Sequence, residues 1–158
     1  MLLFSVGCAA SNSADNTDTS DGTEQSTPSD GDQDIEEKVT EMYITINGNK
    51  MRVTLTRNSS VDALVELLRQ GNITYTANDY GGFEKVGSLG HMLPTNHVQT
   101  VTEPGDIVLY QTNQIVMFYG SNSWSYTRIG KLNYLSQSEL ESFLGAGSGS
   151  VQVTISLK

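Results

Sequence analysis

The stretch "GDIVLYQTNQIVMFYGSNSWSYTRIGKL", residues 105–132, decides the fold of this chain. It contains two nearly continuous apolar runs, 107–110 and 115–119, separated by a short polar link. Such runs are typical of strands that are covered on both faces, or of a barrel wall with helices outside it. The link contains Thr112-Asn113 and predicts a hairpin, and the alternating segment 123–132 predicts a further strand.

The flanking sequence carries the same two-residue period. "MYITIN" and "KMRVTLTR" alternate around "NGN" at 47–49, which predicts a hairpin. We expect further strands at 72–77, 83–86, 97–101 and 151–157.

Two segments predict short helices. Ser59 followed by Asp62 predicts an N-terminal capping box, and Gly71 predicts a left-handed stop. Between them, four apolar residues fall at helical spacing: Val61, Leu64, Val65 and Leu68.

The second predicted helix begins after Ser136. This residue is the expected N-cap, with Glu139 as its reciprocal partner. Leu135 and Leu140 occupy the positions of a hydrophobic staple. Together these patterns predict a mainly β domain at 41–158, a closed eight-stranded antiparallel barrel with two short capping helices.

Charge divides the chain of 158 residues in two. Residues 9–40 hold nine carboxylates against Lys38, a net of −8, whereas 41–158 hold nine acids and eight bases, a net of −1. The acidic tract is poor in apolar residues, so we expect a disordered linker. Neither part has a basic stripe, and we expect no nucleic-acid partner.

The N-terminal segment 1–8, "MLLFSVGC", resembles the end of a bacterial lipoprotein signal. The resemblance implies that Cys8 carries a lipid, that 9–40 is a spacer, and that the protein lies outside the cytoplasm on the cell envelope. Its only membrane contact would then be the lipid anchor. The alternative is a free cysteine at the end of an unspecific disordered tail.

The folded part resembles a cyclophilin over residues 104–145. Cyclophilins have a strand glutamine, a tryptophan ten residues later, and then a strand ending in Phe-Gly-Lys-Val before a helix. This chain has Gln114, Trp124 and "RIGKL" at 128–132 in the same order. The resemblance implies a cyclophilin-like barrel, similar to small bacterial cyclophilin-like proteins of unknown function. It does not by itself imply activity.

Prolyl isomerisation in that family is understood to need an arginine guanidinium and an apolar pocket. In this chain there is no arginine between Arg69 and Arg128, and Lys85 cannot replace its planar fork. The pocket phenylalanine of the family falls on Val116, and its histidine falls near Tyr126. Trp124 matches in both type and spacing.

A different site can be drawn from the same strand. Trp124, Tyr126 and Arg128 alternate, so they are expected to share a face, and Tyr80 and Phe83 could line the same groove. With Val116, these residues are our candidate binding site for a peptide or small ligand in the barrel mouth. The alternative is that Trp124 belongs to the core and that Tyr126 and Arg128 are a packed pair.

Other chemistries lack support in the sequence. The only histidines, His91 and His97, have no cysteine beside them, and we expect neither a metal nor a cofactor. "GAGSGS" at 145–150 precedes a strand, which is the wrong order for a phosphate loop.

We therefore expect a binding or accessory domain that lacks conventional prolyl isomerase catalysis. The alternative is an envelope isomerase with a relocated catalytic arginine, for which Arg128 is the candidate.

Overall fold

The computed structural model describes residues 37–158. The signal-like segment, Cys8 and nearly all of the acidic linker lie outside the described residues. The elements are β1 (Glu41–Ile46), β2 (Asn49–Leu55), α1 (Ser59–Gln70), β3 (Ile73–Tyr80), β4 (Glu84–Ser88), β5 (Val98–Val101), β6 (Asp106–Tyr110), β7 (Gln114–Phe118), β8 (Ser123–Leu132), α2 (Gln137–Leu144) and β9 (Ser150–Ser156).

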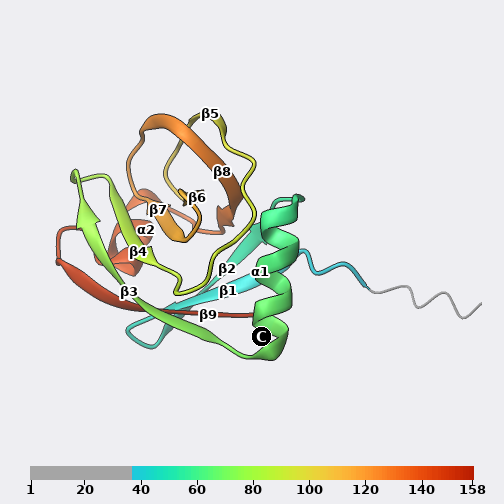
Figure 1. Cartoon of the computed structure of the whole chain (residues 1–158). Coiled ribbons are helices and arrows are strands. Elements are labelled where there is room, and N and C mark those ends of the chain that lie inside the picture. The colour runs from blue at the N-terminus through green and yellow to red at the C-terminus, as the bar shows by residue number, and fades with distance from the viewer. Residues whose placement is uncertain (1–36) are drawn as a thin grey trace, which may run out of the picture. The chain divides into compact units, whose positions relative to one another are not determined.

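The predicted eight-stranded antiparallel barrel is confirmed (Figure 1). Its strands follow the order β2-β1-β9-β3-β4-β7-β6-β8, and β8 pairs with β2 to close the cylinder. A ninth strand, β5, pairs only with the first half of β8, where Thr100 lies opposite Trp124. β8 is long enough to pair with β5 over one part of its length and with β2 over another.

Gly130 lies where the barrel closes, opposite Leu55 of β2. A Cβ at this position would collide with the backbone oxygen of Thr54, so the close approach of the two strands needs a glycine. A register shift beside it, between Ile107 and Val108 of β6, adds one residue to β8.

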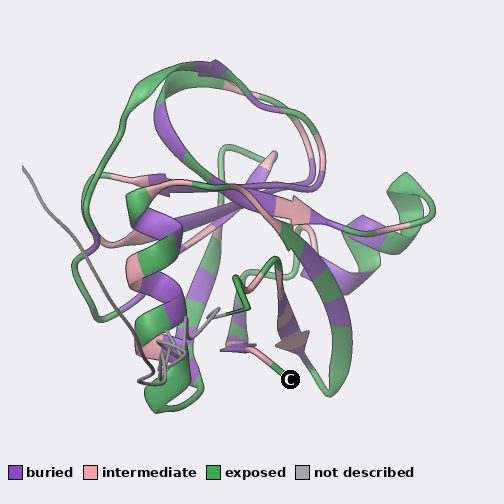
Figure 2. Ribbon diagram, turned by 90° about the vertical axis from the view of Figure 1, so that its right-hand side faces the viewer, coloured by how far each residue is buried: buried purple, intermediate pink, exposed green. Residues whose placement is uncertain are grey.

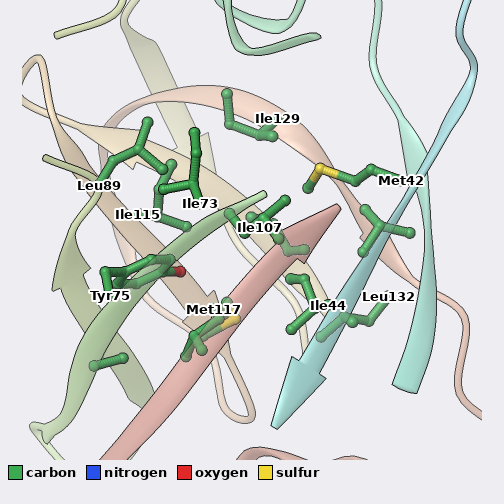
Figure 3. Close-up of a cluster of buried hydrophobic side chains, with 14 of the residues drawn as sticks. Met42, Ile44, Ile73, Tyr75, Leu89, Ile107, Ile115, Met117, Ile129 and Leu132 are labelled. Carbon is green, nitrogen blue, oxygen red and sulfur yellow. The ribbon is translucent and has the colours of Figure 1, made fainter. Parts of the chain in front are cut away.

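The apolar runs of β6 and β7 are covered on both faces. Ile107, Ile115 and Met117 point into the barrel (Figure 3), and with Leu109 they belong to its main core. The alternate residues of these two strands, Val108, Val116 and Phe118, point outward, where they form a second, smaller apolar cluster with Tyr126 of β8. This double coverage explains why the alternation is lost in these strands and kept in β1, β2 and β9.

Helix α1 packs its predicted apolar stripe into the main core, visible as buried bands in Figure 2. Its start differs from the prediction, because the Asn58 side chain accepts a hydrogen bond from the Val61 amide and Ser59 is already helical. Asparagine is as good an N-cap as serine, and Asn58 takes the N-cap position in place of Ser59. Gly71 is also not left-handed, since its φ is 159° and its ψ 167°.

Helix α2 begins as predicted, with Ser136 accepting a hydrogen bond from the Glu139 amide. The hydrophobic staple is wrong, because Leu135 is 96% exposed while Leu140 is fully buried. The Glu139 carboxylate instead accepts from the Leu135 amide, which fixes the chain at the helix entry without an apolar contact.

Candidate functional site

A groove of about 380 Å³ lies on the outer face of the barrel wall. Its base is the second apolar cluster, on strands that run side by side as β4-β7-β6-β8. The predicted residues therefore meet on the outside of the wall rather than at the barrel mouth. The lining residues come from β3, β4, β6, β7, β8 and the turn before β8: Tyr80, Glu84, Val86, Tyr110, Val116, Asn122, Trp124 and Tyr126.

Tyr126 is the most buried aromatic residue that lines the groove. Its ring meets those of Tyr110 and Phe118 edge to face, with centroid separations of 6.2 and 5.8 Å. Its hydroxyl accepts a hydrogen bond of 3.0 Å from the Asn122 amide. Burial, followed by the nearby Glu84 carboxyl, raises the pKa of Tyr126. The ring is thus held as a neutral, fixed wall.

Trp124 and Tyr80 stand at the rim and are mostly exposed, by 58% and 64%. The alternative placing of Trp124 in the core is therefore wrong. Large aromatic faces left open to solvent beside a hollow are typical of a surface that binds something.

Glu84 is the one carboxyl that lines the groove, and it is only 6% exposed. It faces outward because it lies opposite Phe118 in the sheet, while Val86 lies opposite Val116. Its Oε2 atom is buried without a hydrogen-bond partner among the described residues. This apolar setting raises the pKa of the Glu84 carboxyl to about 7.

Sequence reasoning missed Glu84, although a signal existed. Strand β4 was predicted close to its true position, and the two-residue period puts Glu84 on the face of Val86. A charged residue on an otherwise covered strand face is a candidate for function.

Arg128 and Phe83 are absent from the residues that line the groove. The Arg128 guanidinium lies 3.0 Å from the buried Asp106 carboxylate and donates to the Val101 oxygen at 3.2 Å. Phe83 stacks on Phe118, with parallel rings 6.5 Å apart, and supports the groove from one side. The structure thus brings four of the six predicted binding residues together: Tyr80, Val116, Trp124 and Tyr126.

Lys85 points away from the groove, into the barrel, and is fully buried. Its ammonium lies 2.8 Å from Asp79 and donates to the Gly149 oxygen. Burial opposes ionisation of Asp79, but hydrogen bonds from Lys85, the Gly149 amide and the Tyr119 hydroxyl outweigh it and lower the pKa of Asp79. Lys85 is therefore committed to this internal pair.

Within residues 37–158, no three histidine, cysteine, aspartate or glutamate side chains gather closely enough to hold a metal ion. In the same part of the chain, no helix has the length and apolar character to span a bilayer.

The model of the cyclophilin-like family matches residues 44–156, which is most of the described part of the chain. The chain belongs to this cyclophilin-like family. A hypothetical protein from Archaeoglobus fulgidus, known from its solution structure, is similar with a TM-score of 0.57 and 14% identity. The match covers 78% of this chain and 100% of the archaeal one, and at this identity it shows a common fold alone. No curated protein matches the sequence.

Proposed function

We propose that this member of the cyclophilin-like family is a binding module of the bacterial cell envelope, which holds a peptide or small ligand in the outer groove. The observation that carries the proposal is the groove itself, where exposed Trp124 and Tyr80 stand at the rim of a packed apolar base. Its volume, about 380 Å³, is within the range of roughly 300–1,000 Å³ typical of small-ligand sites.

The groove supports binding better than prolyl isomerisation. Among its lining residues there is no arginine or lysine, so no cation faces a bound prolyl amide. An isomerase would need Arg128 to leave Asp106, a carboxylate that is 3% exposed. That exchange would leave a buried charge with one cation fewer and is unfavourable.

Trp124 gives a direct test because it is the only tryptophan of the chain. Capped proline-containing and proline-free tetrapeptides would be titrated into the full-length protein while its fluorescence is followed. We expect a saturable change with at least one peptide, and no acceleration of cis–trans exchange in a proline-peptide assay. Rate enhancement that disappears in Arg128→Ala would overturn the proposal in favour of the isomerase.

The envelope location is part of the same proposal and rests on the sequence around Cys8. Labelled palmitate fed to expressing bacteria should be incorporated into the protein and not into Cys8→Ala. Equal labelling of the two proteins would remove the anchor from the proposal while leaving the groove untouched.

A further inference from the structure

Within residues 37–158, the Oε2 atom of the Glu84 carboxyl has no hydrogen-bond partner, and no cation is among the residues that line the groove around it. Lys85, the next residue, faces the opposite side of the sheet and pairs with Asp79. Arg128 is held by Asp106. Among the residues that line the groove, the acid is thus left without a counterion in an apolar setting, which is costly unless something else supplies one.

The other residues that line the groove are suited to binding the positively charged group that Glu84 lacks. Four of the eight lining residues are aromatic with electron-rich faces: Tyr80, Tyr110, Trp124 and Tyr126. A cation held against such faces is attracted by the ring quadrupole, and the attraction grows when water is excluded. A carboxylate at the base and aromatic rings around it would meet one ammonium or guanidinium group from several sides.

We propose that the outer groove recognises a cationic group, an amine or guanidinium, with Glu84 as its counterion and Trp124 as an aromatic wall. This inference deepens the proposed function and rests on it, because it assumes that the groove is a binding site. The same chemistry could come from a basic side chain of a peptide or from a small-molecule amine.

Because Glu84 changes its protonation state near neutral pH, the proposal predicts how the affinity for a cation changes with pH. A carboxyl with a pKa of about 7 changes from mostly neutral to mostly ionised between pH 6 and 8. The other titratable lining residues are all tyrosines, Tyr80, Tyr110 and Tyr126, and burial raises the pKa of Tyr126. Behind the sheet, Lys85 and Asp79 neutralise each other. If a cation binds only to the ionised carboxylate, its affinity should therefore rise by about tenfold between pH 6 and pH 8.

An affinity that falls as pH rises would indicate a different binding mode. A protonated Glu84 could donate a hydrogen bond to a neutral carbonyl group. Binding of that kind would weaken as pH rises, so the sign of the pH dependence separates the two modes.

The probes are three molecules of similar size and shape: 2-phenylethylammonium, 2-phenylethanol and phenylacetate. A capped Gly-Lys-Gly peptide serves as a second cationic probe that distinguishes a peptide source from a free amine. Each is titrated into the full-length, ¹⁵N-labelled protein at pH 6, 7 and 8, and shifts of the Trp124 indole and Tyr126 amide signals report occupancy.

Three variants complete the experiment. Glu84→Gln keeps the size of the side chain and should lose both the preference for cations and the pH dependence. Trp124→Ala, at a rim position that contributes little to folding, should weaken cation binding several-fold at all pH values, read from the Tyr126 amide. Glu66→Gln, on α1 and outside the groove, is the matched control and should behave as the wild type.

The inference is supported if either cationic probe binds at least tenfold more tightly than the alcohol and phenylacetate at pH 8. It is overturned if the alcohol or phenylacetate binds equally well, or if affinity falls with pH, and the groove then remains a binding site of other chemistry. If none of the four probes perturbs the groove signals, the inference fails, whereas the peptides tested above still decide the proposed function.

Discussion

Lys85 and Asp79 form an ion pair of 2.8 Å on the inner side of the same strand that presents Glu84 outside. The alternation of β4 thus places a neutralised charge in the core and an unneutralised one at the groove. Because the fully buried Lys85 donates to both Asp79 and the Gly149 oxygen, it cannot neutralise the charge of Glu84, the residue before it. Adjacent residues of opposite charge therefore serve different parts of the molecule.

Glu84 should make stability decrease as pH rises. Its pKa lies near 7 in the folded protein against an ordinary value of 4.5, so the folded state keeps a proton that the unfolded state has lost. The free energy of unfolding should fall between about pH 4.5 and 7 by up to about 3 kcal/mol, and then level off. Urea unfolding of wild type and Glu84→Gln across this range measures the effect, and the variant should lack this part of the slope.

Glu66→Gln serves again as the control, since Glu66 is exposed and should leave the slope unchanged. A Glu84→Gln profile parallel to that of the wild type would show that the carboxyl ionises normally in the folded protein.

Removing the two members of the internal ion pair should have unequal costs. Asp79→Ala leaves the Lys85 ammonium fully buried with only the Gly149 oxygen as partner, and should cost about 3–5 kcal/mol of unfolding free energy. Lys85→Met leaves Asp79 with hydrogen bonds from Tyr119 and the Gly149 amide, so we expect a smaller loss. Equal losses in chemical denaturation would contradict this account.

The strands of the barrel could be predicted because the pattern of apolar residues that marks each of them lies within a short segment of the sequence. The runs at 107–110 and 115–119 are apolar on both faces, and the structure covers both, one with the core and the other with the groove cluster. Closure by β2 and β8 joins residues far apart in sequence, and Gly130 marks it only once the strands are known to meet. The strand at 97–101 was predicted, but its position outside the cylinder, paired with β8, has no local signal.

Only part of the site was predicted. Strand alternation determines on which face of the sheet a side chain lies, but not which residues that side chain contacts. Trp124 and Tyr126 follow from the pattern of β8. Arg128 shares that pattern, yet the buried carboxylate of Asp106 attracts its guanidinium away from the groove. The ion pair depends on the pairing of β6 with β8, a tertiary fact. Strand alternation places Glu84 on the outer face, but only the folded structure shows that its Oε2 atom is buried without a hydrogen-bond partner among the described residues.

Gly130→Ala should weaken barrel closure. The added methyl group would collide with the Thr54 oxygen and contact Val53, so β2 and β8 must separate. We expect a loss of about 1–3 kcal/mol, the usual range for overpacking. Hydrogen exchange should show where the barrel is weakened, with faster exchange of the β2 amides and little change in β3. Gly82→Ala, in an open turn at φ 75°, tests strain without a collision, and its effect should not reach β2.

The start of α2 allows a paired test of its cap. Ser136→Ala removes the acceptor for the Glu139 amide and should cost about 1 kcal/mol. Leu135→Ser should be nearly neutral, because Leu135 is 96% exposed. Thermal unfolding of both variants measures the difference. A larger loss from Leu135→Ser than from Ser136→Ala would restore the hydrophobic staple.

Arg128→Ala separates a structural role from a catalytic one. The substitution leaves Asp106 paired with Lys131 at 3.2 Å, so we expect a modest loss of about 1 kcal/mol in unfolding free energy. The affinity of the groove for its ligands should change less than twofold, because Arg128 does not line it. Arg128→Lys keeps the charge but not the fork to Asp106 and the Val101 oxygen, and should recover part of the stability. If Arg128→Ala instead abolished ligand binding while unfolding as the wild type does, the guanidinium would have to reach the groove in solution.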